Sequence, residues 1–427
     1  MNDTMTAMAK SIGFNVEKVR KEFPILSKKI NGKQLIYFDS AATGHKPKRV
    51  IDKLYSFYLE EYGKPNEKHT LGKEATKEMD DARSKVASFI GASKKEVIFT
   101  KGCTEGINIV AGGFARGILR KGDIVLITEL EHHSNIVPWI MACETTGAEL
   151  RVIPILPSGE LDMKVFEKML TKKVKIISVS HSSHVLGTVL PIREITKMAH
   201  KRDIPVLVDG AQYAPYAKID VKKLDCDFYT FSGHKMGSPS GIGVLYGKSS
   251  WLEKLPPYEG GNDMAKEVRF EEAVFANIPQ KFEAGTQPFA QIIAFGELID
   301  FLNEIDMEKS SQYEQELLKY ATERLFEIEK VKVIGVAREK EPVISFYLDS
   351  MDVKDLEKFL DEKYNIAVRA GELSAQPLMK VLDIPDSQLL RVSLCYYNTF
   401  DEIDVLIRAV KRFIKEEDEK IFPSKIF

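Results

Sequence analysis

Cysteine is scarce in this chain. Four cysteines in 427 residues cannot supply the disulfide framework on which small secreted proteins depend. No two of them are spaced as Cys-x-x-Cys, so the sequence offers neither a zinc-ligand pair nor a dithiol redox motif. We therefore expect a protein that is held together by hydrophobic cores.

The chain also lacks an excess of charge and any long apolar run. It has 61 Lys and Arg against 63 Asp and Glu, a formal net charge of -2, which gives no overall field to hold DNA or RNA. The apolar runs fall far short of the ~20 residues that a membrane span needs, and residues 1–10 contain no apolar signal core. These absences predict a globular cytoplasmic protein without nucleic-acid or membrane partners, and its size favours an enzyme.

What the sequence does contain is a regular alternation of strand-like and helix-like segments. Between residues 96 and 209, apolar strand-like segments alternate with helix-like ones, and several strands are apolar nearly throughout. This pattern is typical of a mostly parallel sheet that helices cover on both faces. Two further strands, 228–232 and 243–246, follow with little helix between them. We expect a large α/β domain over residues 36–290.

The pattern changes after residue 290. Two long helix-like stretches, 292–305 and 309–328, precede strands and helices that predict mostly antiparallel pairing. We expect residues 291–427 to form a smaller α+β domain, and residues 1–35 to form an N-terminal lead that packs on it.

Two strands of the larger domain end in residues that could carry chemistry. Asp209 closes one apolar strand, at the edge where open α/β sheets bind ligands, although an isolated Asp there is commonly a helix N-cap or turn residue. Lys235 follows another strand and precedes a Gly-rich turn, where a lone Lys is commonly a surface residue. Because the two strands are expected to be neighbours, the carboxylate and the amine are predicted to lie close together.

Pyridoxal phosphate (PLP) is a cofactor that needs this pair. A Lys amine holds it as a Schiff base, and a carboxylate keeps its pyridine nitrogen protonated so that the ring accepts electrons. A partly desolvated pocket lowers the Lys pKa, which favours imine formation. The phosphate needs helix N-terminal N–H groups and hydroxyls, which we expect at Cys103 and Thr104 after Gly102, with Ser232 and His234 as further donors.

Further segments occur in a fixed order along the chain. They are Tyr37-Phe-Asp-Ser-Ala-Ala, Cys103-Thr-Glu-Gly-Ile-Asn, Glu131-His-His-Ser-Asn-Ile-Val-Pro-Trp, His184-Val-Leu-Gly-Thr, Val208-Asp-Gly-Ala-Gln, Asp225-Cys-Asp-Phe-Tyr, Phe231-Ser-Gly-His-Lys, Phe282-Glu-Ala-Gly-Thr, Arg369-Ala-Gly and Arg391-Val-Ser-Leu-Cys-Tyr-Tyr-Asn-Thr. With them the chain resembles the class V aminotransferase family and, within it, the type II cysteine desulfurases, which include selenocysteine-lyase-like enzymes. The resemblance implies the PLP-dependent transferase fold type I.

The resemblance assigns roles to the matching positions. Around the cofactor it implies that Lys235 forms the Schiff base and shuttles protons, Asp209 pairs with the pyridinium, Gln212 and His184 lie near the phenolic oxygen, His132 stacks on the ring and transfers protons, and Cys103, Thr104, Ser232, His234 and the partner subunit's Thr286 bind phosphate. At the substrate it implies that Arg391 binds the carboxylate, with Ala41 and Arg369 nearby.

These roles compete with plainer ones. His132-His133 could be an ordinary polar loop pair, and Arg391 a structural ion-pair arginine. No metal is expected, because the histidine pair lacks neighbouring Cys or Asp ligands. The resemblance further implies a homodimer that acts on the C–S bond of L-cysteine or a related sulfur or selenium amino acid, mobilising sulfur for iron–sulfur cluster assembly, with a sulfur-acceptor protein as a possible partner.

Two positions depart from the family pattern. The type II loop reads Arg-x-Gly-His-His-Cys-Ala, whereas here Glu372 and Leu373 replace the histidines and Ser374 stands where the nucleophilic cysteine belongs. A serine hydroxyl is neither nucleophilic enough at neutral pH nor able to hold persulfide sulfur. His184 stands where the family usually has Asn, and an imidazole there could titrate near neutrality.

Several explanations of the missing thiol remain open. Ser374 could be an engineered change, although Glu372-Leu373 speak against a single designed substitution. Sulfur could leave directly, as sulfide or as persulfide to an external thiol, so that the enzyme is a C–S lyase, or the fold could serve another PLP reaction such as transamination or β-elimination. The chain could also be a non-catalytic, desulfurase-like binding partner. Cys103 and Cys395 are alternative thiols, for which we expect structural roles.

Overall fold

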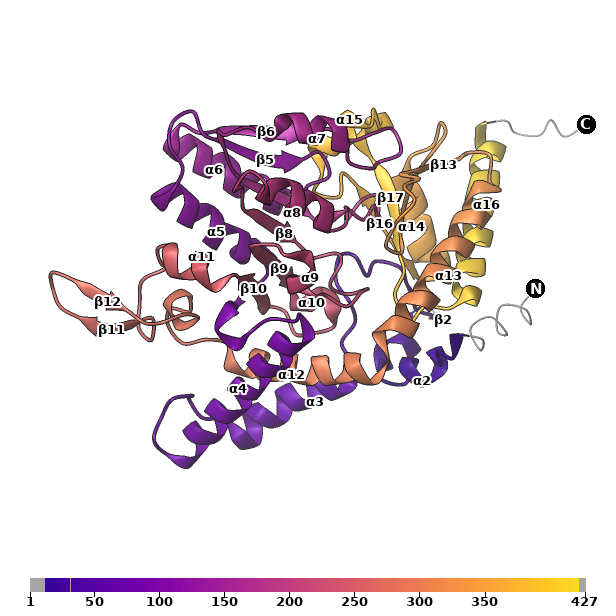
Figure 1. Ribbon diagram of the computed structural model, residues 1–427. Coiled ribbons are helices and arrows are strands. Elements are labelled where there is room, and N and C mark those ends of the chain that lie inside the picture. The colour runs from indigo at the N-terminus through magenta and orange to yellow at the C-terminus, as the bar shows by residue number, and fades with distance from the viewer. Residues whose placement is uncertain (1–11, 31, 422–427) are drawn as a thin grey trace, which may run out of the picture.

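A seven-stranded sheet forms the centre of the protein (Figure 1). The computed structural model describes residues 12–30 and 32–421. The sheet order is β4-β10-β9-β8-β7-β5-β6, formed by β4 (Val97–Thr100), β5 (Ile124–Thr128), β6 (Glu149–Ile153), β7 (Val174–Ser180), β8 (Val206–Asp209), β9 (Phe228–Ser232) and β10 (Gly243–Gly247). Strand β10 runs antiparallel to β4 and β9, and the pairs from β9 to β6 are parallel. The predicted α/β class with a mostly parallel sheet is confirmed.

Helices cover both faces of this sheet. They include α4 (Thr70–Phe89), α5 (Cys103–Gly117), α6 (Val137–Thr146), α7 (Met163–Met169) and α8 (Ile192–His200). Alternate residues of β5 enter two separate hydrophobic cores, Ile124 and Leu126 in one and Val125 and Ile127 in the other. Since side chains of a strand alternate between its faces, a strand covered on both sides must be apolar at every position, which explains the continuous apolar runs.

The C-terminal part forms a second, four-stranded sheet with the order β13-β14-β17-β16, antiparallel throughout. Its strands are β13 (Val331–Ile334), β14 (Val343–Leu348), β16 (Arg369–Gly371) and β17 (Leu389–Ser393), and α13 (Met307–Phe326), α14 (Val353–Tyr364) and α16 (Phe400–Ile421) accompany it. The segment 366–371 is divided between two sheets. β15 (Ile366–Ala367) pairs in parallel with β3 (Ile36–Tyr37), and β16 then joins the antiparallel sheet.

The N-terminal region and one long helix connect the two sheets. Helix α12 (Phe289–Glu304) packs on α4 and on α3 (Lys48–Ser56). Near the N-terminus, α2 (Val16–Arg20) contacts α16, where Arg20 forms a 2.9 Å ion pair with Glu402. The proposed division into residues 1–35, 36–290 and 291–427 stays a prediction, and residues 1–11 and 31 of the N-terminal lead lie outside the described residues.

A two-stranded hairpin that the sequence analysis did not anticipate projects from the large sheet region (Figure 1). It consists of β11 (Ala265–Val268) and β12 (Ala273–Phe275), paired antiparallel. Its residues are mostly exposed, and Phe270 in the connecting turn is fully so. Because neither strand faces a core, their sequences carry no burial pattern that would reveal them.

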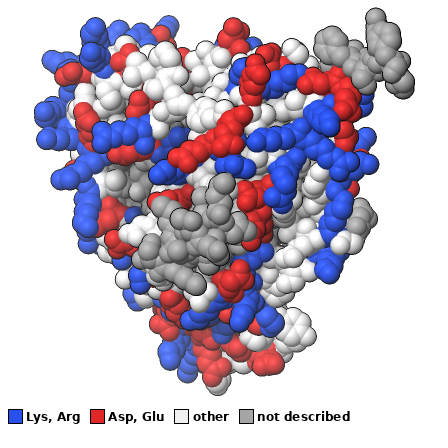
Figure 2. Space-filling view, turned by 90° about the vertical axis from the view of Figure 1, so that its right-hand side faces the viewer, with Lys and Arg blue, Asp and Glu red and all other residues white. Residues whose placement is uncertain are grey.

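Charges on the surface are mixed in sign. Figure 2 shows acidic and basic side chains interspersed over one face, in keeping with the net charge of -2. Within residues 12–30 and 32–421, no helix has both the length and the apolar character to cross a bilayer. The same residues contain no cluster of three or more His, Cys, Asp or Glu side chains placed to hold a metal ion.

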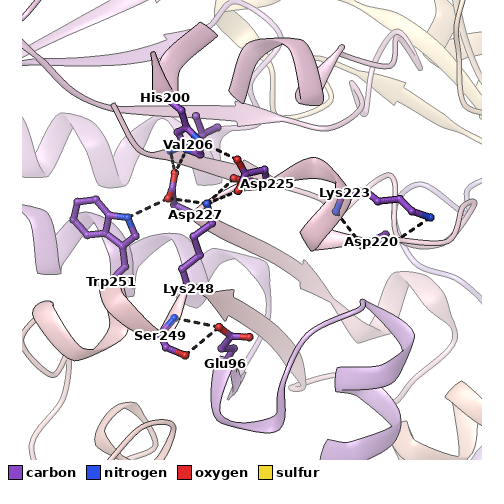
Figure 3. A network of polar contacts seen from close by, with 10 residues as sticks. All are labelled: Glu96, His200, Val206, Asp220, Lys223, Asp225, Asp227, Lys248, Ser249 and Trp251. Carbon is purple, nitrogen blue, oxygen red and sulfur yellow. Dashed lines mark hydrogen bonds and ion pairs between the residues drawn. The ribbon is translucent and has the colours of Figure 1, made fainter. Parts of the chain in front are cut away.

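A polar network ties together the amino ends of β8 and β9 and the carboxyl end of the antiparallel β10 (Figure 3). Asp227, just before β9, accepts hydrogen bonds from the backbone N–H of Val206 at 2.8 Å and from Trp251 Nε1 at 3.1 Å. His200 at the end of α8 lies 2.8 Å from the same carboxylate, and Lys248 after β10 forms an ion pair with it at 3.4 Å. The network therefore fixes the end of the sheet opposite to Asp209.

Candidate active site

A cavity of about 250 Å³ lies where the carboxyl ends of the central strands meet the C-terminal sheet. The predicted site residues that line it are Ala41, Cys103, Thr104, His132, His184, Asp209, Gln212, Ser232, His234, Lys235, Arg369, Ser374 and Arg391. Thr286 does not reach this cavity and lines a different one beside Asn66 and Asp263. Its predicted role, as a residue lent by a partner subunit, therefore stays a prediction.

Asp209 is held rigidly at the end of β8. Its Oδ1 accepts a hydrogen bond from the backbone N–H of Ala211 at 2.9 Å and one from Cys103 Sγ at 3.1 Å. Burial and the neighbouring carboxylate raise the pKa of the Cys103 thiol well above its usual value. Cys103 is therefore a neutral structural donor that orients the carboxylate, as expected from its place at the start of α5.

Helix α5 points its N-terminus into the cavity because it packs directly on β9. A Cβ at Gly106 would lie 2.1 Å from Thr230 Oγ1, so only glycine permits this approach. The Cys103 backbone N–H donates to Ser232 Oγ at 2.8 Å, and Thr104 Oγ1 lies 2.9 Å from Ser134 Oγ. Amide and hydroxyl groups thus gather at a helix N-terminus, an arrangement suited to an anion.

Lys235 lies on the short helix α10 (Gly233–Met236) directly after β9. Burial lowers the pKa of its amine, while the carboxylate of Asp209 opposes that shift. The neutral amine is the form that reacts with an aldehyde. Because desolvation lowers the pKa of the amine, a larger fraction of it is neutral at physiological pH. The predicted proximity of Lys235 and Asp209 is thus found in the structure.

The hydrogen bonds of His132 and His184 fix which ring nitrogen carries the proton. His132 Nδ1 accepts from the Ser134 backbone N–H at 3.0 Å, so its neutral ring carries hydrogen on Nε2. His184 Nε2 lies 2.8 Å from the Leu373 carbonyl, which only accepts, so Nε2 is the protonated nitrogen there. The rings meet edge to face with centroids 4.8 Å apart. Each of the two imidazoles therefore has one donor nitrogen and one acceptor nitrogen, both assigned by its hydrogen bond.

Both imidazoles are neutral at physiological pH. Burial, with the nearby Lys235, lowers the pKa of His132 to about 4. Burial also lowers the pKa of His184 well below its usual value, helped by His132 and Arg391. The expectation that His184 titrates near neutrality is wrong, because a buried ring beside cations is costly to protonate.

Glu131 supports the His132 turn and was not recognised from the sequence. Its buried carboxylate accepts hydrogen bonds from Thr128, Asn135 and both the backbone and the hydroxyl of Ser180, at 2.5 to 3.0 Å. Burial raises the pKa of Glu131 to about 7 in spite of these donors. Its position directly before His132, next to a strand end, is the signal that could have identified it.

Arg391 reaches the cavity from β17. Its Nη2 donates to Asp39 at 2.9 Å and its Nη1 to the His184 carbonyl at 3.1 Å, which fixes the plane of the guanidinium. Arg369, Lys235 and Arg391 face a single lining carboxylate, that of Asp209. The two guanidinium groups make the cavity suited to a ligand with more than one anionic group.

The segment that carries Ser374 is a tight turn with an unusual backbone. Leu373 and Ser374 have φ of 53° and 57°, and the Ala375 N–H donates to the Glu372 carbonyl at 2.9 Å, which closes the turn. Such left-handed conformations cost on the order of 1 kcal/mol each in residues other than glycine. The Leu373 side chain is buried against the cavity, so tertiary contacts must hold the turn.

Several lining residues escaped the sequence analysis. They are Ala42, Ser134, Ser180, Ser182, Ala211 and Leu373. Ser180 could have been found, since it ends a strand neighbouring Asp209. The second alternative thiol, Cys395, is buried, and burial and Glu314 raise its pKa well above the usual value. A thiol in that state is poorly suited to nucleophilic attack.

Comparison with known proteins agrees with this geometry. The model of the family described as aminotransferase class-V matches residues 36–406. A cysteine desulfurase of Serratia proteamaculans is 44% identical over 407 residues, covering 95% of this chain and 99% of that protein.

Two solved structures are similar as well. The cysteine desulfurase CsdA of Escherichia coli, in an S-sulfonic acid form, has a TM-score of 0.87 at 33% identity, over 94% of this chain and 99% of that one. An apo cysteine desulfurase of Thermococcus onnurineus NA1 has a TM-score of 0.89 at 32% identity, over 94% and 98%. The match of residues 36–406, together with these similarities, shows that the chain belongs to the class V aminotransferase family.

Proposed function

We propose that the chain is a PLP-dependent enzyme that cleaves the C–S bond of L-cysteine or a related sulfur or selenium amino acid. The class V aminotransferase family is PLP-dependent, and relatives at 44% identity are cysteine desulfurases. The observation that carries the proposal is the desolvated Lys235 beside Asp209, in a cavity that Arg369 and Arg391 also line.

The residues around the cavity fit PLP. Asp209 Oδ1 is engaged by Ala211 and Cys103, which holds the carboxylate for a protonated ring nitrogen. The buried Gln212 Oε1 has no hydrogen-bond partner among the described residues, so it is free to accept a hydrogen bond from a donor on a bound ligand. Cys103, Thr104, Ser232 and His234 would hold the phosphate, and bound PLP would supply an electron sink for charge at the substrate α-carbon.

The surrounding side chains would divide the remaining work. Arg391 would bind the substrate carboxylate through the guanidinium edge that Asp39 and the His184 carbonyl leave open. Lys235, with its lowered pKa, would take the α-proton. His132 would offer the Nε2 proton to the substrate side, because its Nδ1 is engaged by the backbone. Ala41 and Arg369 would complete the substrate side of the cavity.

The fate of sulfur follows from Ser374. A hydroxyl cannot carry persulfide sulfur, so in desulfuration the thiol of an external molecule or of a sulfur-acceptor protein would attack the substrate sulfur and leave as a persulfide, with alanine as the other product. In β-elimination the sulfur would instead leave as sulfide, with pyruvate and ammonia as the other products. Iron–sulfur cluster assembly would be the physiological setting. Ser374 equally favours a second candidate, a β-eliminating C–S lyase. We also propose a homodimer in the cytoplasm, with Thr286 of one subunit near the cavity of the other.

Product analysis distinguishes these reactions. The purified, PLP-loaded chain is incubated with L-cysteine, L-cystine and L-selenocysteine, and alanine, pyruvate and released sulfide or selenide are measured. Alanine supports desulfuration, and pyruvate supports β-elimination. Failure to form any product from the whole panel would refute both and leave transamination of another amino acid or a non-catalytic binding role.

A further inference from the structure

The turn that carries Ser374 forms few hydrogen bonds with the rest of the protein. Ser374 and Leu373 both adopt left-handed backbone conformations, which the local sequence does not favour, since neither is Gly, Asn or Asp. Outside the turn itself, two hydrogen bonds reach their carbonyls in the described structure. His184 Nε2 donates to the Leu373 carbonyl at 2.8 Å, and the His133 backbone N–H donates to the Ser374 carbonyl at 3.2 Å.

The side chain of His184 is well placed to act as a clamp. It is buried, and its own carbonyl accepts a hydrogen bond from Arg391 Nη1 at 3.1 Å. The ring also packs edge to face on His132. Residues that line the cavity thus fix the position of the His184 ring. Its Nε2–H donates to a carbonyl that lies 189 positions further along the sequence.

We propose that His184 is a positioning residue whose Nε2–H holds the turn Glu372–Ala375 closed against the active-site cavity. A side chain that reaches the Leu373 carbonyl is needed because the turn is intrinsically strained. The clamp keeps the Leu373 side chain and the Ser374 hydroxyl as a fixed wall of the cavity on its substrate side. The departures at 184 and at 372–374 are then one structural change, because the clamp links the two positions.

The same hydrogen bond determines what His184 offers to the cavity. Since Nε2 carries the proton, Nδ1 carries a lone pair, and the described residues provide no donor to it. His184 therefore presents an acceptor to a ligand, where an asparagine amide could present a donor. This consequence deepens the proposed function and rests on it, whereas the clamp itself does not.

Two substitutions separate the clamp from general packing. Glutamine places an amide nitrogen near the position of histidine Nε2, whereas asparagine is shorter and places it near Nδ1. His184→Asn should therefore release the turn, and His184→Gln should retain it. Both are polar and neutral, so they form a matched pair.

Hydrogen exchange of the PLP-loaded protein without substrate measures the clamp directly. The Ala375 amide, which closes the turn, should exchange faster in His184→Asn by on the order of tenfold, as expected for loss of one buried hydrogen bond. In His184→Gln the rate should stay within about twofold of wild type. Equal protection of the turn in wild type and His184→Asn would overturn the proposal, as would equal loss of protection in both variants.

A second measurement needs no destabilised variant. In the 15N spectrum of histidine-labelled wild-type protein, the His184 resonances, assigned by their absence from His184→Gln, should show hydrogen on Nε2. Hydrogen on Nδ1 would overturn the clamp.

Kinetics then test the role in the proposed reaction. With L-cysteine, His184→Asn should raise KM more than it lowers kcat, and His184→Gln should restore KM. A raised exchange rate with unchanged KM would refute the positioning role. If the wild-type protein is inactive on L-cysteine, the proposed function fails while the exchange result still decides the clamp.

Discussion

At the scale of single residues, the cavity is defined by which groups are charged and which are not. Lys235, Arg369 and Arg391 meet one lining carboxylate, while burial keeps His132 and His184 neutral. Glu131 orients the His132 turn through four accepted hydrogen bonds. The chemistry thus depends on a few desolvated groups, each held by backbone or by a buried partner.

Replacement of Lys235 tests the centre of the proposal. Lys235→Ala should lower the rate on L-cysteine by at least ~10³-fold, since proton transfer by a positioned group contributes a factor of roughly 10² to 10⁴. Borohydride should attach PLP to residue 235 in the PLP-loaded wild type and should not do so in Lys235→Ala. Initial rates and peptide mass spectrometry provide the measurement. Labelling at another lysine in the wild type would contradict the assignment.

Ser374 can be replaced by the thiol that the family pattern predicts. After incubation with L-cysteine without reductant, Ser374→Cys should carry an additional sulfur atom at this position that dithiothreitol removes, because the turn holds the side chain at the cavity. Ser374→Ala and wild type serve as controls and should carry none. Intact-protein mass spectrometry measures the added mass of one sulfur atom. The same stable increase on the wild type would show that another residue accepts the sulfur.

At the scale of secondary-structure elements, buried polar groups determine how the elements join. The network around Asp227 links α8, β8 and the segments next to β9 and β10 (Figure 3). Glu341, just before β14, donates its backbone N–H to the Gly187 carbonyl at 2.8 Å and so links the His184 segment to the C-terminal sheet. Both connections contain titratable groups, so pH should act on them.

The His200 connection should weaken as pH rises. The hydrogen bond to Asp227 raises the pKa of His200 above its usual value, so its stabilising effect is complete below the unfolded pKa and is lost as pH rises through the higher folded pKa. The difference in thermal midpoint between wild type and His200→Gln should therefore be larger at pH 6 than at pH 9. A difference that is independent of pH would show that the ion pair contributes nothing.

Glu341 should also lose its stabilising contribution as pH rises, over a window that begins at a lower pH than that of His200. Burial raises its pKa to about 8, so the folded state retains a proton that the unfolded chain releases. Between about pH 4.5 and 8, this group lowers the free energy of unfolding by at most about 1.4 kcal/mol per pH unit. Glu341→Gln, which stays neutral, should therefore be more stable than wild type at pH 8.5 and similar at pH 5 in urea titrations; the reverse order at pH 8.5 would contradict this.

Much of the fold could be predicted from the sequence, because strands and helices that face a core show a regular pattern of apolar residues. Strand β5 lies between two cores and is apolar from Ile124 to Ile127. Elements without a core face, such as β11 and β12, leave no such pattern and were missed. The cavity residues next to strand ends, Asp209 and Lys235, were predictable in the same way.

Long-range contacts set the limit of that prediction. The hydrogen bond from His184 to Leu373 joins residues 189 positions apart, and no local preference indicates it. The left-handed backbone of Leu373 runs against the preference of leucine. Both depend on how the two sheets meet, so they could only come from the structure.

At the scale of the whole molecule, the projecting hairpin suggests where a second subunit would bind. Phe270 and Val268 at its end are largely exposed, and exposed apolar groups that cluster on a surface commonly mark an interface. If the chain is a homodimer, Phe270→Glu should raise the dimer dissociation constant by at least ~10-fold, about 1.4 kcal/mol. Sedimentation analysis measures it, with Glu271→Gln as the matched control; an unchanged constant would place the interface elsewhere.

The four cysteines, scarce in the sequence and all buried as free thiols in the fold, have a practical consequence. A single cysteine introduced on the surface would be the one site that a maleimide dye or a nitroxide spin label reaches readily. Labels on the hairpin and on α16 could then report separations within and between subunits by energy transfer or pulsed resonance, without first removing native thiols.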